Sequence, residues 1–182
     1  MPVRWRAVDA LVTIERLDGE AARNHRDALA VVLHDCVEGG ASVSYMAPFS
    51  LADARAHFEG IQPEVESGRR VLLAAFVNGE LAGTVQIAAA WPPNQPHRAD
   101  VAKLLVRRSA RNRGVGHLLM ERAEVEAMSE GWKLLVLDTV TGDPAERLYE
   151  RMGWTKVGVI PSYALYPDGR PCDTTVFWKA VG

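Results

Sequence analysis

The stretch LLVRRSARNRGVGHLLMERAE, residues 104–124, joins an apolar run to an amphipathic segment through a turn rich in arginine and glycine. After Gly114 the apolar residues recur at three- and four-residue spacing, which predicts a helix that runs to about Gly131. The unpaired amides and the positive dipole end of a first helical turn bind anions, and glycines let a phosphate approach the backbone. The turn at Arg111 and Arg113 therefore predicts a phosphate-binding site.

Two common nucleotide motifs do not fit this turn. A dinucleotide-binding fold requires a third glycine at the position where Leu119 stands. The phosphate loop of nucleotide triphosphatases requires Gly-Lys-Ser or Gly-Lys-Thr, which this stretch lacks. On its own, Gly-x-Gly before a helix also suits tight packing of the helix on a strand, so the surrounding elements must decide.

Those surrounding segments predict a mixed sheet. Upstream, two apolar runs flank Asn78-Gly79, which is the strongest short signal for a hairpin of antiparallel strands. Residues 133–139 (KLLVLDT) form a nearly continuous apolar run, typical of a strand in the middle of a sheet. The segments 154–160 and 174–181 alternate well enough to predict the last two strands.

Helices are predicted between these strands. Apolar spacing indicates one helix from about residue 20 to residue 37, and Ser50 followed by Asp53 resembles a capping box that begins another. Asp143 followed by proline indicates an N-cap with proline in the first helical turn, and this short helix ends at Gly153.

Length and composition favour one ordinary globular domain. The chain has 182 residues, of which 48% are hydrophobic and 24% charged, so we expect a single domain, at 13–182. Residues 1–12 show little periodicity, so we expect them to form a loosely held arm. A net charge of −2 lacks the basic excess that nucleic-acid binding requires. Cys36 and Cys172 have no metal-site spacing, so we expect neither zinc nor a disulfide and favour the cytoplasm. No window reaches the length of a membrane span, so we expect no membrane partner.

Taken together, Arg-x-x-Gly-x-Gly at 111–116 and DPAERLYERMGW at 143–154 resemble the paired signatures of the GNAT superfamily of N-acetyltransferases. The segments 39–43, 134–139 and 158–171 are similar to tabtoxin-resistance acetyltransferases within that superfamily. The resemblance covers the chain from about residue 12. It implies an α/β fold of the α+β type, the GNAT-like acyl-CoA acyltransferase fold, with a mixed sheet of about six to seven strands, a splayed parallel pair and about four flanking helices.

The resemblance also implies where acetyl-CoA binds as co-substrate. It lies where two parallel strands, here residues 101–106 and 133–139, splay apart, and its pantetheine arm extends one strand. Backbone groups of Leu105 and Val106 are expected to hold the pantetheine. The residues expected around the pyrophosphate are Arg111, Asn112, Arg113, Gly114, Val115, Gly116 and His117. No metal is expected.

Acetyl transfer by direct attack in a ternary complex needs a neutral amine and a proton donor for the leaving thiolate. The resemblance makes Tyr149 the candidate acid, or a hydrogen-bond donor to the sulfur, although a tyrosine packed on the sheet also fits this position. Asp100 and Asp138 are the candidates for a base or for a carboxylate that holds the amine. Asp100 is one methylene shorter than the glutamate expected there, so a bridging water is the favoured route. Both acids also suit ordinary roles at a strand edge or a turn.

The acceptor is expected to be a small-molecule primary amine, either amino-acid-like or toxin- or antibiotic-like. Residues 39–46 are expected to form a lid over its pocket. Candidate side chains for the pocket are Ser42, Tyr45, Trp91, His97 and Tyr163. A non-catalytic acyl-CoA sensor and a protein or peptide N-acetyltransferase stay open as alternatives, as does a homodimer formed through the last strands.

Overall fold

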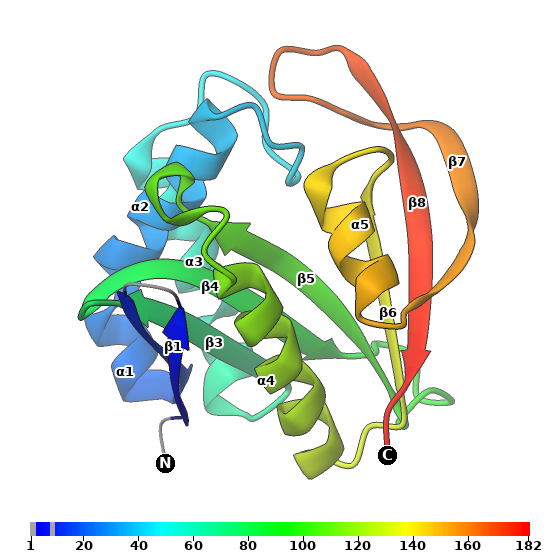
Figure 1. Cartoon of the computed structure of the whole chain (residues 1–182), viewed down its shortest axis with the longest axis horizontal. Coiled ribbons are helices and arrows are strands. Elements are labelled where there is room, and N and C mark those ends of the chain that lie inside the picture. Colours follow the sequence, from blue (N-terminus) through cyan, green and yellow to red (C-terminus); the bar gives the residue numbers. More distant parts are fainter. Residues whose placement is uncertain (1–2, 8–9) are drawn as a thin grey trace.

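The computed structural model describes residues 3–7 and 10–182, with side chains from residue 11 onward. Within that part, eight strands form one mixed sheet in the order β1-β2-β3-β4-β5-β6-β8-β7 (Figure 1). The strands are β1 (Val3–Ala7), β2 (Ala10–Leu17), β3 (Arg70–Val77), β4 (Glu80–Ala89), β5 (Arg98–Val106), β6 (Leu134–Val140), β7 (Thr155–Leu165) and β8 (Pro171–Ala180).

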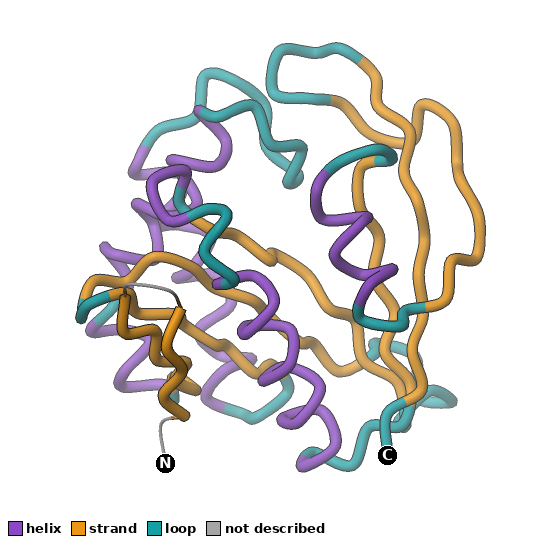
Figure 2. The backbone as a smooth tube through the Cα atoms, viewed as in Figure 1, coloured by secondary structure: helices purple, strands orange, loops and turns teal. Residues whose placement is uncertain are grey.

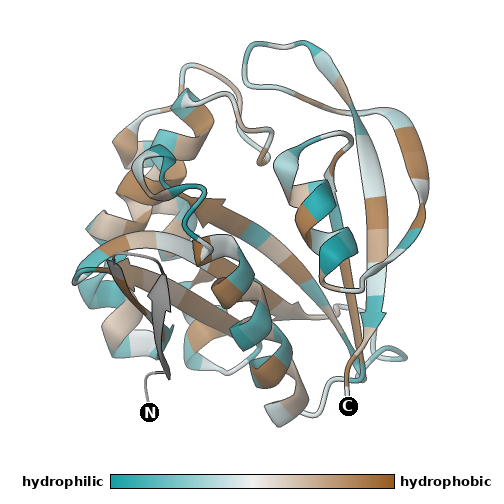
Figure 3. Cartoon of the chain, viewed as in Figure 1, coloured by the Kyte–Doolittle hydropathy of each residue, from teal (hydrophilic) through white to brown (hydrophobic). Residues whose placement is uncertain are grey.

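Helices cover both faces of this sheet. They are α1 (Gly19–Asn24), α2 (Arg26–Glu38), α3 (Leu51–Glu66), α4 (Val115–Ser129) and α5 (Pro144–Arg151), with one 3₁₀ turn at Arg108–Ala110. The central strands are rich in hydrophobic residues, as Figure 3 shows. These residues divide between two buried clusters, because α1 to α3 pack on one face of the sheet and α4 and α5 on the other. Along β3, Leu73 packs towards α4 while its neighbour Leu72 packs towards α2 and α3.

The parallel pair β5 and β6 splays as expected. The two strands pair only from Arg98–Leu134 to Asp100–Val136. Beyond Asp100 the pairing of β5 with β4 also shifts register between Thr84 and Gln86, and Figure 1 shows β5 and β6 moving apart from there. In Figure 2 the loop at residues 39–50 and the turn between β7 and β8 lie at this open end.

Several predicted features are confirmed. Asn78 and Gly79 form the hairpin turn with φ values of 51° and 87°, in the left-handed region that such a turn requires. The Ser50 side chain accepts from the Asp53 amide while the Asp53 side chain accepts from the Ser50 amide, so the capping box is present. The strand, helix, strand order around α4 also follows the prediction.

Two expectations differ from the structure and explain why the element counts are higher than predicted. Within the expected arm, Val3–Ala7 form β1 and pair antiparallel with β2. The alternation of polar and apolar residues in VRWRA supports this strand. Residues 1, 2, 8 and 9 of the expected arm lie outside the described residues. The helix expected over 20–37 is broken at His25, where the sequence has neither glycine nor proline and the His25 ring packs edge-on against Phe76. Among the described residues, no helix is long and apolar enough to cross a bilayer.

Candidate active site

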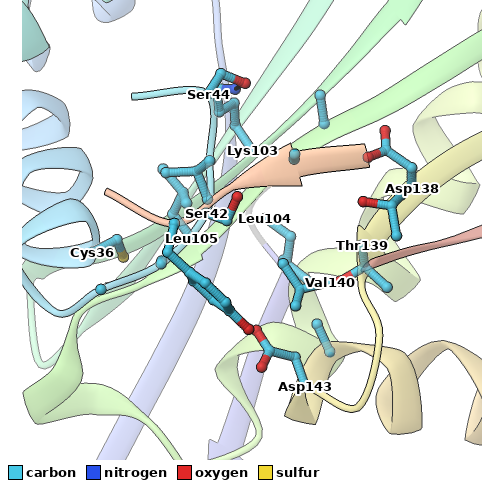
Figure 4. Close-up of a pocket in the computed structure, with 18 of the residues that line it drawn as sticks. Cys36, Ser42, Ser44, Lys103, Leu104, Leu105, Asp138, Thr139, Val140 and Asp143 are labelled. Carbon is cyan, nitrogen blue, oxygen red and sulfur yellow. Dashed lines mark hydrogen bonds between the residues drawn. The ribbon is translucent and has the colours of Figure 1, made fainter. Parts of the chain in front are cut away.

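A cavity of about 870 Å³ opens where β5 and β6 separate. Its walls are residues 101–106 of β5, residues 138–140 of β6, the loop at 39–46, the start of α5 and residues 163–166 near the end of β7. Figure 4 shows side chains from these segments facing the same space. The splay therefore brings parts of the chain that are distant in sequence to one site.

The β5 wall offers backbone groups to an extended ligand. On one edge, Leu105 and Val106 pair with β4, while the edge toward β6 has no strand partner beyond Asp100 in the part of the chain that the structure describes. An unpaired strand edge presents N–H and C=O groups to which an extended chain adds as another strand. The Val106 carbonyl already accepts from Arg111 Nε at 3.1 Å, which ties the following turn to this edge.

The turn after β5 has the geometry of an anion site. Gly114 is the N-cap of α4 with φ of 77°, and no side chain caps the first helical turn. Asn112 also lies in the left-handed region, at φ of 60°. This turn leaves the first amides of α4 without side-chain partners, as phosphate binding at a helix N-terminus requires.

The residues expected to bind the cofactor fall into two groups. Leu105, Val106, Arg111 and Gly116 line the cavity. The others lie beside it: Asn112, Arg113 and Gly114 are exposed, Val115 is buried in the core, and the imidazole of His117 faces Glu121 at 3.2 Å. These side chains do not line the cavity, so a role for them at the pyrophosphate rests on backbone amides.

Tyr149 lies on α5 at the floor of the cavity and is 5% exposed. Its ring packs against the rings of Trp154 and Phe177, each with centroids 5.9 Å away. Among the residues whose side chains the structure describes, none hydrogen-bonds its hydroxyl. Burial, together with the negative charge of Asp138, raises the pKa of this phenol above its ordinary value, so the hydroxyl stays protonated.

The two candidate carboxylates occupy different environments. Asp138 lines the cavity, and burial raises its pKa, with the charge of Asp100 adding to that rise and the charge of Lys103 opposing it. Asp100 forms an ion pair with Arg98, does not line the cavity and has a half-exposed side chain. Asp100 sits where β5 still pairs with β6, before the strands separate. The structure thus brings Asp138 and Tyr149 together and leaves Asp100 outside.

The candidate acceptor residues divide in the same way. Ser42, Tyr45 and Tyr163 line the cavity. Trp91 is 83% exposed and outside it, and His97 lies outside as well, where its carbonyl accepts from Lys133 and Leu134 amides. Both were expected in the pocket, but their loop joins the end of β5 opposite to the cavity.

The lid at 39–46 is attached to the β7–β8 segment. Ser42 Oγ donates to the Leu165 carbonyl at 2.7 Å, and the Ala47 amide donates to the Pro167 carbonyl at 2.9 Å. These two bonds close one side of the cavity. They join residues that are more than a hundred positions apart in the sequence, so no local pattern predicts them.

Sequence reasoning missed Lys103, which lines the same cavity. Its Nζ donates to Ser44 Oγ at 3.0 Å and lies 5.7 Å from the centroid of the Tyr45 ring. Burial lowers the pKa of Lys103, while the charge of Asp138 opposes that fall. The available signal was a lysine inside the otherwise apolar run VAKLLV.

Residues 41–154 match the acetyltransferase (GNAT) family, and the chain belongs to that family. Members of the family are acetyltransferases that use acetyl-CoA, and the splayed pair with its phosphate turn is where the resemblance implied that acetyl-CoA binds. Among the described residues, no cluster of histidine, cysteine and acidic side chains suits a metal ion.

The chain is also similar to individual proteins that are named as acetyltransferases. A streptothricin acetyltransferase of Escherichia coli is 29% identical over 106 residues, 57% of this chain and 58% of that protein, so the match spans little more than half of the relative. An N-acetyltransferase of the hisH–hisA intergenic region of Azospirillum brasilense is 28% identical over 129 residues, 70% of this chain and 74% of that protein. The solved structure of yncA from Salmonella typhimurium with its cofactor acetyl-CoA has a TM-score of 0.76 at 19% identity, covering 94% of each chain, and shows the same fold.

Proposed function

We propose that this protein is an acetyl-CoA-dependent N-acetyltransferase that acts on the primary amine of a small molecule. One observation carries the proposal: a single cavity joins the phosphate turn and the free edge of β5 to Asp138 and Tyr149. Family membership supports acetyl-CoA as co-substrate, and the unpaired β5 edge suits its pantetheine arm.

The arrangement suits direct attack in a ternary complex. The amine nitrogen forms the new C–N bond to the acetyl carbonyl carbon while the C–S bond breaks, so the amine loses a proton and the thiolate gains one. Asp138, as a carboxylate in the cavity, holds the amine and accepts its proton, directly or through a water. The protonated hydroxyl of Tyr149 donates to the developing thiolate.

Two alternatives make different demands. A non-catalytic acyl-CoA sensor has no need for a buried tyrosine and a carboxylate that line one cavity. A protein or peptide acetyltransferase needs an open groove, whereas here residues 39–46 are hydrogen-bonded to the β7–β8 segment across the cavity. The first observation favours an enzyme over a sensor, and the second favours a small acceptor over a protein or peptide.

The acceptor classes to test first are amino acids and antibiotic-like amines. The resemblance of residues 158–171 to tabtoxin-resistance acetyltransferases stays a prediction, and one relative is a streptothricin acetyltransferase. A location in the cytoplasm also stays a prediction, supported by Cys36 and Cys172 being free, buried thiols. A homodimer is a further prediction, because β7 is an edge strand with exposed Val157, Val159 and Ile160.

Calorimetric titration with acetyl-CoA, followed by a thiol-release assay over a panel of amines, tests the proposal. Gly116→Ala provides a sharp variant, because its added Cβ meets Leu148 Cδ2 at an ordinary 3.5 Å yet fills part of the cavity. We expect acetyl-CoA to bind about tenfold more weakly, a cost of about 1.4 kcal/mol, with the thermal midpoint nearly unchanged.

The matched control is Gly60→Ala on α3, where an added Cβ meets nothing within 4 Å. It should bind acetyl-CoA as the wild type does. Failure of the wild-type protein to bind acetyl-CoA would refute the proposal, and binding without thiol release from any amine would favour the sensor.

A further inference from the structure

Lys103 lines the cavity from the run VAKLLV at 101–106, which is otherwise apolar. Its backbone lies in the left-handed region, with φ of 53°, next to the register shift between β4 and β5. This conformation is costly for a residue with a Cβ, and such strain concentrates at functional positions. Figure 4 shows its side chain beside Ser44, on a different wall from Asp138.

The surroundings of Lys103 leave its charge without an ion-pair partner. Its Nζ donates to the neutral Ser44 hydroxyl and lies over the Tyr45 ring, and among the described side chains no carboxylate forms a salt bridge with it. Arg70 adds further positive charge nearby, and Asp138 is the acidic group that acts on it from across the cavity. A half-buried ammonium without a carboxylate partner favours an anionic ligand.

A second donor lies beside it, and the hydrogen-bond chain behind Tyr45 fixes its direction. Arg70 donates to Gln86 Oε1 at 2.8 Å, so the amide nitrogen of Gln86 faces His57 Nε2 at 3.0 Å. The Gln86 amide nitrogen can only donate, so His57 Nε2 must accept. The proton of the neutral His57 ring is therefore on Nδ1, which donates to Tyr45 Oη at 2.8 Å. The hydroxyl hydrogen of Tyr45 is then free to point into the cavity.

This neutral state of His57 has a physical cause. Burial, with the nearby charges of Lys103 and Arg70, lowers the pKa of His57 to about 4. The ring is therefore uncharged in the neutral pH range, and the direction of the chain from Arg70 to Tyr45 holds there.

The phosphates of the co-substrate do not need these two donors. The proposed phosphate turn begins at Arg111, beyond the end of β5, and Lys103 lies three residues before Val106, roughly 10 Å back along the strand. Ser44 and Tyr45 belong to the segment 39–46, which is expected to cover the acceptor pocket. The unpaired positive charge therefore belongs to the acceptor half of the cavity.

We propose that Lys103 and Tyr45 bind a carboxylate of the acceptor while Asp138 holds its amine, so that the substrates are zwitterionic, amino-acid-like amines. This inference rests on the proposed acetyltransferase function. Lys103 and Tyr45 determine specificity, and His57 and Gln86 are positioning residues that act through Tyr45.

The test compares matched acceptors in the thiol-release assay. Each amino acid is paired with its carboxamide and with the amine that lacks the carboxylate, and kcat and KM are measured for all three. We expect the wild type to prefer the free acid by roughly 10- to 100-fold in kcat/KM, the range set by one charge-assisted hydrogen bond.

Lys103→Met keeps an unbranched side chain that is one atom shorter and removes the charge. We expect the KM for the free acid to rise by roughly 10- to 100-fold, with kcat and the KM for the carboxamide little changed, and with acetyl-CoA binding intact. Lys103→Arg should retain part of the preference, and Tyr45→Phe should weaken it. His57→Gln should weaken it less than Tyr45→Phe, because the tyrosine hydroxyl remains.

The control is Lys133→Met, which removes an exposed lysine outside the cavity and should leave every kinetic constant unchanged. Equal use of acid and carboxamide by the wild type, or equal loss of both in Lys103→Met, would overturn the inference and leave the acetyltransferase proposal standing. If the wild type neither binds acetyl-CoA nor releases thiol with any amine, the proposed function itself fails. Acetyl-CoA titration and a thermal melt of each variant show that a lost preference does not come from a lost fold.

Discussion

Replacing Tyr149 with phenylalanine removes the candidate proton donor and little else. The ring is 5% exposed and packs on Trp154 and Phe177, and phenylalanine preserves both contacts. The lost hydroxyl has no hydrogen-bond partner among the described side chains, so no protein group is left unsatisfied. We therefore expect the free energy of unfolding to change by less than about 0.5 kcal/mol.

The size of the catalytic effect follows from the raised pKa of Tyr149. An alkyl thiol has a pKa of about 8.5 and an ordinary tyrosine one of about 10, so proton transfer from phenol to thiolate is uphill by at least about 2 kcal/mol. Burial raises the tyrosine pKa further, which keeps the donor protonated but makes it a weaker acid. The hydroxyl thus acts mainly as a hydrogen-bond donor to the sulfur, and we expect kcat to fall about 100-fold, the lower end for general acids.

Steady-state thiol release at saturating acceptor measures this loss, and calorimetry shows whether acetyl-CoA still binds. Because the tyrosine stays protonated, the wild-type kcat should show no alkaline decline from this group below about pH 10. Phe177→Leu is the control: it disturbs the ring packing beside Tyr149 and costs about 1 kcal/mol or more of stability, but keeps the hydroxyl. A kcat of Tyr149→Phe within twofold of wild type, or an equal loss in Phe177→Leu, would refute the role.

Three further results are expected. Asp138→Asn should lower kcat/KM for the acceptor about 100-fold. It should also remove the acid limb of the pH profile of kcat/KM, because burial raises the pKa of Asp138 and the wild type becomes protonated there as the pH falls; an unchanged limb would contradict this role. Gly83→Ala places a Cβ 2.9 Å from the Leu105 carbonyl oxygen, so calorimetry should show a loss of about 1–3 kcal/mol and weaker acetyl-CoA binding, whereas Gly60→Ala should stabilise slightly. Because the pKa of His57 is depressed from 6.5 to about 4 on folding, its contribution to stability is complete above pH 6.5 and lost as pH falls toward 4; chemical denaturation of His57→Gln should show a flatter dependence.

Local sequence patterns predicted most of the fold because they report local physics. The Asn78-Gly79 turn requires positive φ, Ser50 and Asp53 satisfy amides of one helical turn, and the spacing after Gly114 creates one apolar helix face. The cofactor half of the site was predictable for a related reason. A phosphate turn and a strand edge use backbone groups, so the glycines at Gly114 and Gly116, read together with the strand before them and the helix after them, were enough to predict where both lie.

The side of the cavity that we propose for the acceptor was harder to predict, because contacts between residues distant in sequence build it. The lid is held by a bond from Ser42 to Leu165, and the orientation of Tyr45 depends on His57 and Gln86 from other elements. Trp91 and His97 looked suitable by residue type but lie outside the cavity. Residue type alone could not show which end of β5 their loop would join.

One departure from regular β structure links the two halves of the cavity. A regular β5 would continue its pairing with β6, and its edge would then be unavailable to a ligand. The pairing instead stops at Asp100, the β4 register shifts, and Lys103 takes a left-handed conformation within the same few residues. The irregularity therefore frees the strand edge that suits the co-substrate and also places Lys103 at the cavity, where we propose that the acceptor binds. An apolar sequence pattern indicates which residues are buried, but it does not indicate an irregularity such as this register shift. For that reason the sequence did not identify Lys103 as a site residue, and the folded chain did.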